Sequence, residues 1–303
     1  MNQQEENKIA GTRSNGTGGN FSHALATRFN VPMTLDVAPE DQPVNRGLDP
    51  VWLEHRFELF ERFCLPSVRA QDCQNFKWFV YFDVRTPEVF RSRIEKHAAA
   101  WPLLRPKFVA AFDTGLLLRH IREEFATVRP WLITTRLDND DAIALDFIAT
   151  VQKNFVPSQR TVLNFPLGFS WQDGRVYLDR QRSNPFTSLV EETEQAITIL
   201  SSDHRYLESI ASLKQVKIHP MWMQVIHGRN LCNQVRGVRW AVRSARKRFA
   251  VDRSAWGSDR PVQLIAESVR GMAAIAREKG IGRVAHEIRN VLAAKRGVSH
   301  DNQ

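Results

Sequence analysis

The chain has 303 residues, of which 43% are hydrophobic, so it can bury a large core without the help of disulfide bridges. Its three cysteines, Cys64, Cys73 and Cys232, lie far apart and show no CxxC spacing, which argues against a disulfide framework or a zinc knuckle and favours a reducing cytoplasm. The net charge is +9, and the residues from Arg236 onward hold 15 Lys and Arg against 6 Asp and Glu, which leaves 27 of each kind before them.

The first segment, residues 1–20, is polar and rich in Gly and Asn. It lacks the apolar core of a secretory signal, so we expect a disordered tail. No later stretch approaches the roughly 18 unbroken apolar residues that a membrane-spanning helix needs. The sequence therefore predicts a cytoplasmic protein without a transmembrane helix.

Between residues 21 and 155, strand patterns alternate with helix patterns. Short apolar or β-branched runs predict strands at 21–29, 77–83, 105–112 and 131–135. Helical spacing of apolar residues predicts helices at 50–71, 86–101, 115–128 and 144–155, the first of them capped by Asp49. This alternation predicts an α/β fold with a largely parallel sheet and helices on both faces. Ligands of such sheets bind beyond the carboxyl ends of the strands.

The second half of the chain has a different pattern. Two alternating runs around the turn Gln172-Asp173-Gly174 predict a β-hairpin over residues 160–181. Helices are predicted at 192–200 and 204–213, and the C-terminal part is predicted to be helical at 239–250, 263–280 and 283–295. We therefore expect residues 21–235 to form one domain and residues 236–303 a basic helical extension.

The stretch TTRLDNDDAI places three carboxylates directly after the predicted strand 131–135. Residues i and i+2 of an extended chain point to the same side, so Asp138 and Asp140 share a face. Without basic neighbours the two carboxylates repel each other unless a cation lies between them, and Mg²⁺ or Mn²⁺ accepts such oxygen ligands together with substrate phosphates. The alternative is that Asp140 or Asp141 only caps the next helix.

An ordered set of motifs accompanies this acidic turn: TRFN, PSVRAQ, FKWFVYFD, TTRLDNDDAI, NPFTSL and WMQVIHGRNL. Together they resemble the bacterial putative rhamnosyltransferase family, which uses the type A glycosyltransferase fold. The resemblance covers about residues 21 to 235. It implies a metal-dependent, inverting enzyme that moves rhamnose or a similar sugar from a nucleoside diphosphate donor to a hydroxyl of a glycan or lipid-linked acceptor.

The resemblance also implies roles for individual residues. Asp83 would bind the base or ribose of the nucleotide, in a pocket lined by Thr27 and Arg28. Asp138 and Asp140 would hold Mn²⁺ or Mg²⁺ against the donor diphosphate. His227 would be the third metal ligand, although a structural role is about equally expected. Arg136 would add positive charge near the phosphates, or else form a structural ion pair.

An inverting transferase needs a carboxylate that takes the proton from the acceptor hydroxyl. Glu191 is the first candidate for this base, with Glu192 and Asp203 after it. The alternative for the two glutamates is a place in the first turn of a helix, where acidic side chains favour the helix dipole.

The stretch VRGVRWAVRSARKRF, in the basic extension, mixes cations with apolar residues and could contact an anionic membrane, while specific nucleic-acid binding is not expected. Two other functions are considered. A nucleotidyltransferase of similar fold would use the same carboxylates, but it usually adds a Gly-rich loop and a Lys that are not seen here. A non-catalytic nucleic-acid or envelope-binding protein would depend on the basic extension alone.

Overall fold

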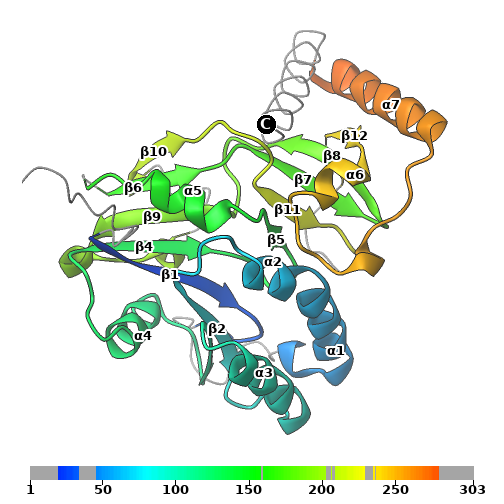
Figure 1. Ribbon diagram of the computed structural model, residues 1–303. Coiled ribbons are helices and arrows are strands. Elements are labelled where there is room, and N and C mark those ends of the chain that lie inside the picture. Colours follow the sequence, from blue (N-terminus) through cyan, green and yellow to red (C-terminus); the bar gives the residue numbers. More distant parts are fainter. Residues whose placement is uncertain are drawn as a thin grey trace, which may run out of the picture.

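The computed structural model describes residues 20–33, 46–157, 160–202, 206, 209–228, 235 and 237–279. Its centre is a seven-stranded sheet in the order β10-β6-β9-β4-β1-β2-β3 (Figure 1). The strands are β1 (Phe21–Arg28), β2 (Lys77–Asp83), β3 (Leu104–Val109), β4 (Trp131–Arg136), β6 (Thr161–Asn164), β9 (Thr187–Glu192) and β10 (Ser212–Gln215). Only β9 runs against the others in this described sheet, so the predicted largely parallel sheet is confirmed.

Helices cover both faces of this sheet, as predicted. They are α1 (Pro50–Leu59), α2 (Leu65–Arg69), α3 (Glu88–Ala100), α4 (Leu116–Glu124) and α5 (Phe147–Lys153). Apolar residues of α1, α2, α3 and α5 belong to one buried cluster, and those of α4 to another. Strand β1 shows how one strand serves both clusters, because Leu25 joins the first, whereas Ala24 and Ala26 join the second.

The predicted helix 50–71 is three connected pieces. Helix α1 begins with Asp49, whose Oδ1 accepts a hydrogen bond of 2.8 Å from the backbone N–H of Trp52, and this confirms the predicted cap. A π-helical turn, Phe60–Cys64, then joins α1 to α2. The apolar side chains of all three pieces pack against the large sheet, which places α1 beside the carboxyl ends of the strands.

A second sheet has the order β12-β8-β7-β11-β5 (Figure 1). Its strands are β5 (Ala142–Ile143), β7 (Leu167–Gln172), β8 (Arg175–Arg180), β11 (Trp222–Val225) and β12 (Val238–Trp240). The predicted hairpin is formed by β7 and β8, joined by Asp173 and Gly174, both with positive φ. Residues 161–164, included in the hairpin prediction, pair instead with β9 and β10 of the large sheet.

The helix predicted at 192–200 is wrong. Residues 187–192 form β9, and only two short 3-10 turns follow, η4 (Thr193–Gln195) and η5 (Ile199–Ser201). The helix predicted at 204–213 is wrong at its end, where Ser212 begins β10. Partner strands decide both cases, because β9 pairs with β4 and β6, and β10 pairs with β6.

The C-terminal part begins with a strand where a helix was predicted. Residues 238–240 form β12, which pairs with β8, and the short helix α6 (Val242–Arg246) follows it. Helix α7 (Pro261–Lys279) confirms the helix predicted at 263–280 and packs on β12, where Arg239 contacts Glu267 at 3.1 Å. The third predicted helix and the predicted N-terminal tail, 1–20, lie almost wholly outside the described residues, and the domain division at 235 stays a prediction.

No helix in the described part of the chain combines the length and the apolar character needed to cross a membrane.

Candidate functional site

The acidic turn lies at the carboxyl end of β4, next to the end of β1. The backbone N–H of Leu137 donates to the carbonyl oxygen of Ala26 at 3.1 Å. The side-chain amide of Asn139 donates to the carbonyl oxygen of Phe29 at 2.9 Å, so Asn139 points into the protein and fastens the turn to β1. The turn therefore lies at the edge of the sheet where the sequence predicts a ligand site.

Asp140 is the most closely held carboxylate of the turn. Its Oδ2 accepts a hydrogen bond of 2.6 Å from Nη1 of Arg56 on α1, and Nε2 of His227 lies 3.0 Å from the same oxygen. Burial raises the pKa of Asp140, but the hydrogen bond to His227 and the charge of Arg56 outweigh burial and lower that pKa. Asp140 is therefore an ionised carboxylate between two basic side chains.

Asp138 is more open to solvent than Asp140. Its side chain is 42% exposed, against 10% for Asp140, and it contacts the guanidinium of Arg136 at 3.2 Å. The two carboxylates have basic neighbours, because the fold brings Arg56 and His227 to Asp140, and Arg136 forms with Asp138 the ion pair considered as its alternative role. Asp138 is the member of the pair that an incoming ligand reaches first.

Asp141 has a structural place. It is buried, and its Oδ1 accepts a hydrogen bond of 2.8 Å from the backbone N–H of Val225 in β11. Burial, followed by the charges of Asp140 and Asp138, raises the pKa of Asp141 well above its usual value. The prediction that Asp141 begins a helix is wrong, since β5 follows it and α5 begins only at Phe147. Asp141 instead fastens the acidic turn to β11, the strand that precedes His227.

The Ser67 and Gln71 side chains hold the segment that follows the aspartates. The hydroxyl of Ser67 accepts from the backbone N–H of Ile143 at 3.3 Å. Gln71 donates to the carbonyl oxygen of Ala144 at 2.7 Å and accepts from the backbone N–H of Ile148 at 2.9 Å. The motif PSVRAQ thus fixes the chain on the far side of the acidic turn and limits its movement.

His227 lies just after β11 and faces two elements. Its Nε2 is directed at Asp140, while its Nδ1 lies 3.5 Å from Nε2 of His55 on α1. The two imidazole rings meet edge to face, with centroids 5.2 Å apart. Residues from α1, the acidic turn and the end of β11 therefore meet at one point.

Asp83 and Thr27 are buried at neighbouring strand ends. Both oxygens of the Asp83 carboxylate accept hydrogen bonds from the side chain of Arg85, at 3.0 and 2.8 Å. The hydroxyl of Thr27 accepts from the indole N–H of Trp78 at 2.9 Å, within the core. Arg28 donates to the sulfur of Met33 at 2.6 Å. Asp83 lies at the predicted edge of the sheet. The Thr27 hydroxyl is instead bonded to Trp78 inside the core.

Glu191 does not lie near the aspartates. It pairs with Leu132 across β4 and β9, which places it at the amino end of the parallel strands. Its carboxylate accepts from Arg160 at 3.1 Å and from the backbone N–H groups of Ile197 and Thr198 at 3.0 and 2.9 Å. Burial raises its pKa. With this position and these partners, Glu191 is not placed to take a proton at the acidic turn.

The other two acids considered as bases are not brought to the turn either. Glu192 is the last residue of β9 and is exposed, opposite Trp131 at the amino end of β4. Asp203 lies outside the described residues. Both glutamates are at the end of a strand, so their predicted place in the first turn of a helix is wrong.

Comparison with protein families gives one match, to the family described as putative rhamnosyl transferase, over residues 24–239. The match takes in the strands of the large sheet and every residue of the acidic turn. The chain belongs to this family. No curated protein gives a significant match.

Several solved structures are similar to this chain, at low identity. S. aureus TarS covers 68% of this chain and 37% of its own, with 11% identity and a TM-score of 0.42. Residues 1–349 of TarS, in complex with UDP-GlcNAc, cover 89% and 70%, with 10% identity and a TM-score of 0.42. GalNAc-T7 with UDP, GalNAc and Mn²⁺ covers 70% and 45%, with 9% identity and a TM-score of 0.39. The chain spans only about a third to three fifths of the first TarS structures.

This family member offers a partial set of metal ligands. Among its described residues, no three His, Cys, Asp or Glu side chains lie close enough together to hold a metal ion. Asp140 and His227 come nearest to such a set, with ligand atoms 3.0 Å apart, but these atoms share a hydrogen bond and the same oxygen of Asp140 accepts from Arg56. A metal would have to replace both contacts and take its remaining ligands from waters and phosphates, because Asp138 is turned to Arg136.

Three residues of the site were not expected from the sequence: Arg56, His55 and Asn139. Arg56 and His55 are on helix α1, far from the aspartates in the chain, and their residue types are common on helices. The one available signal for Asn139 was its place between two aspartates. Only the packing of α1 on the sheet shows that Arg56 lies 2.6 Å from Asp140.

Proposed function

We propose that this protein is a glycosyltransferase that moves a sugar, most simply rhamnose, from a nucleoside diphosphate donor to a hydroxyl group. One observation supports this most strongly. In a chain of the putative rhamnosyl transferase family, Asp140, His227 and Arg56 meet at the carboxyl edge of a parallel sheet, next to Asp138. That edge is where open α/β sheets bind their ligands.

The donor diphosphate is proposed to lie against the acidic turn, with its sugar toward solvent. Arg56 and Arg136 lie within 3.2 Å of the two carboxylates and offer positive charge to the phosphates. Asp140 holds Arg56 and His227 in place, which fixes the donor site before the donor binds. Asp83 and Arg28 remain the proposed nucleotide side of the site, whereas Thr27 is not carried forward, because its hydroxyl is bonded to Trp78 within the core.

We propose Mn²⁺ or Mg²⁺ as the cofactor. Asp140 and His227 would hold the ion, and Asp138 would join them after leaving Arg136. When bound, the ion neutralises the charge that develops on the departing diphosphate. Arg56 would add a second positive charge near the diphosphate, because its guanidinium contacts the oxygen of Asp140 that also faces His227.

The catalytic base is the least defined part of the proposal. Glu191 and Glu192 lie at the opposite edge of the sheet, so neither is carried forward as the base. Asp203 stays a prediction. Inversion at the anomeric carbon also stays a prediction, since it depends on a base that attacks without a covalent intermediate.

The acceptor is proposed to be a glycan or a lipid-linked glycan. Contact with an anionic membrane would depend on charge alone, because Val242, Ala245 and Phe249 of the basic segment are buried in the protein. The neighbouring cations Arg243, Arg246 and Lys247 are exposed. No sequence-specific binding of nucleic acid is proposed.

A panel of nucleotide sugars tests this function. The purified full chain is incubated with each donor, with Mn²⁺, with Mg²⁺ or with EDTA, and the release of nucleoside diphosphate is measured with and without a glycan acceptor. We expect one donor to be turned over, and EDTA to remove most of the turnover. The proposal fails if no nucleotide sugar binds in calorimetry and none is hydrolysed. Turnover that is unchanged in EDTA would contradict the proposed metal cofactor but not the proposed transferase activity.

A further inference from the structure

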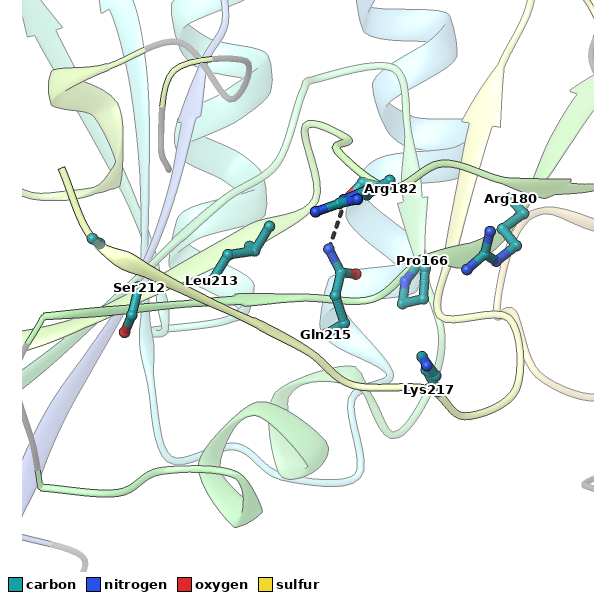
Figure 2. A pocket seen from close by; sticks show the side chains of 8 residues that line it. Pro166, Arg180, Arg182, Ser212, Leu213, Gln215 and Lys217 are labelled. Atoms are coloured by element: carbon teal, nitrogen blue, oxygen red, sulfur yellow. Dashed lines mark hydrogen bonds between the residues drawn. The ribbon is translucent and has the colours of Figure 1, made fainter. Parts of the chain in front are cut away.

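A pocket of about 460 Å³ lies beside β10, away from the acidic turn. Figure 2 shows the side chains that line it, which come from β10 and from the segments next to β6 and β8. Leu213, Gln215 and Lys217 occupy alternate positions of one extended segment, so they face the same side. Lys214, between them, points the other way and does not line the pocket.

The lining of this pocket is basic. Arg180, Arg182 and Lys217 contribute three cations, and none of the described residues that line the pocket is acidic. No carboxylate in the described part of the chain lies within 4.0 Å of these three cations. Arg182 and Lys217 are exposed to solvent and Arg180 is half-buried. Such an arrangement attracts an anion of small size, and a phosphoryl group offers several acceptor oxygens to it.

A polar network holds the backbone of Arg182 in position. The side-chain amide of Asn164 donates to the carbonyl oxygen of Arg182 at 2.9 Å and to Oε1 of Gln215 at 2.8 Å. Gln215 in turn donates to the carbonyl oxygen of Arg182 at 2.8 Å, as the dashed line in Figure 2 shows. The backbone of Arg182 is therefore fixed to both strands, and its side chain extends from a rigid support.

Two buried oxygens beside this network have no hydrogen-bond partner among the described residues. They are Oδ1 of Asn164 and Oγ1 of Thr187. Asn164 pairs with both Thr187 and Gln215 in the sheet, so all three side chains point to the face that carries the pocket. Unpaired buried polar atoms are uncommon and are often satisfied by an ordered water.

The pocket lies along the same edge of the sheet as the proposed donor site. Strands β4, β6 and β10 are parallel, and Lys217 and Pro166 follow the carboxyl ends of β10 and β6. Two to three strand spacings separate β4 from β6 and β10, or about 10 to 15 Å at about 4.8 Å each. One extended acceptor can therefore reach both places.

We infer that this pocket binds a phosphoryl group of the acceptor, while the acceptor's reacting hydroxyl lies at the acidic turn. The inference rests on the proposed function and narrows its substrate class: the acceptor is anionic and longer than one sugar. The phosphoryl group can belong to a phosphorylated glycan or to a lipid phosphate, and both present the same oxygens to Arg180, Arg182 and Lys217.

Binding to the full chain tests the pocket without any transfer reaction. The probes are glucose 6-phosphate, measured by calorimetry against glucose, and vesicles of phosphatidylcholine with phosphatidic acid, measured by sedimentation against phosphatidylcholine alone. We expect one phosphate-bearing probe to bind and its neutral counterpart not to. The double variant Arg182→Ala/Lys217→Ala should weaken that binding about tenfold or more, since it removes two charge-assisted contacts.

Lys214→Ala is the matched control, because it removes one cation from the opposite side of the same strand. It should bind the probe as the wild type does, and both variants should unfold at the wild-type urea midpoint. The inference is overturned if the double variant binds like the control, or if the wild type binds neither phosphate-bearing probe. Binding of the hexose phosphate identifies a phosphorylated glycan, and binding of the vesicles alone identifies a lipid phosphate.

Hydrolysis of the nucleotide sugar without acceptor separates this inference from the proposed function. Both variants should hydrolyse the donor at the wild-type rate, because the pocket lies outside the donor site. Normal hydrolysis together with unchanged probe binding would contradict the pocket alone. The reverse outcome is also distinguishable. If the wild type binds the probe, the double variant does not, and no nucleotide sugar binds, the anion pocket is supported and the proposed transferase activity is contradicted.

Discussion

Two buried carboxylates, Asp140 and Glu191, lie at opposite edges of the same sheet. Asp140 is at the carboxyl edge and contacts two basic side chains, Arg56 and His227, through a single oxygen. Glu191 is at the amino edge, and its two oxygens accept from two backbone N–H groups and from Arg160. Both are acidic residues near the end of a strand, yet their surroundings differ in kind.

The difference indicates which carboxylate is available for ligand chemistry. Glu191 closes a turn of its own chain, since it fixes the backbone at Ile197 and Thr198. Asp140 lies beside the half-exposed Asp138, and its two basic partners come from distant elements. Charged side chains of this kind can also interact with the phosphates of a ligand, whereas the partners of Glu191 are used within its own turn. Four predictions test this contrast.

The largest effect is expected for Asp140→Asn. The amide keeps the size of the side chain but removes the charge that holds Arg56 and His227, so donor turnover should fall about 100-fold or more, equal to about 2.7 kcal/mol in the barrier. The measurement is kcat/KM for donor hydrolysis. Asp113→Asn, on an exposed Asp–Arg pair that follows β3, three strands from β4 in the sheet, is the control and should keep wild-type turnover. Normal turnover in Asp140→Asn would contradict the proposal that the acidic turn takes part in the reaction.

Glu191→Gln should show the opposite pattern. It leaves Arg160 without its buried anion and weakens the closed turn, so the free energy of unfolding should drop by about 1–3 kcal/mol. Turnover per folded molecule should stay at the wild-type level, because the residue lies at the other edge. Urea unfolding and donor hydrolysis, measured on one preparation, check the expected loss of stability and the expected unchanged turnover. A large loss of turnover at unchanged stability would return Glu191 to the list of catalytic residues.

Between the two edges, His23 belongs to a buried polar chain. Its Nε2 lies 2.9 Å from the hydroxyl of Thr135 and its Nδ1 lies 3.2 Å from the amide of Gln152. Burial lowers the pKa of His23 from 6.5 to about 3. Below pH 6.5 the unfolded chain therefore binds a proton that the folded chain does not, and His23 should destabilise the fold increasingly as the pH falls toward 3.

The expected size is about 1.4 kcal/mol per pH unit in this window, or about 1–2 kcal/mol between pH 6.5 and 5. The measurement is the loss of unfolding free energy over that range in the wild type minus the loss in His23→Gln, which does not titrate there. Equal losses in the two proteins would contradict a neutral, buried His23. Donor turnover should not follow this window, since His23 lies away from the acidic turn.

The smallest effect is expected for Glu192→Gln. Glu192 is the neighbour of Glu191 in the sequence, but it is exposed. The substitution should change the free energy of unfolding by less than about 0.5 kcal/mol and leave turnover unchanged. Comparison with Glu191→Gln in the same urea series therefore isolates the contribution of burial. A shift as large as that of Glu191→Gln would mean that Glu192 has a partner of similar strength.

Much of the fold follows from local patterns. Strands β1, β2, β3 and β4 and the helices between them were predicted close to their observed positions, because apolar runs and helical periodicity depend on near neighbours in the chain. The region after residue 185 was predicted less well. Residues 187–192 and 212–215 become strands only because distant strands pair with them.

The sequence by itself determined that Asp138 and Asp140 lie at the carboxyl edge of a parallel sheet, since the turn follows a strand whose direction the βαβ order sets. Tertiary structure alone decided what surrounds them. The packing of α1 brings Arg56 to Asp140, and the reversed direction of β9 carries Glu191 to the opposite edge. Residue spacing encodes which side of a strand a side chain takes, but strand direction and helix packing depend on contacts between segments far apart in the chain.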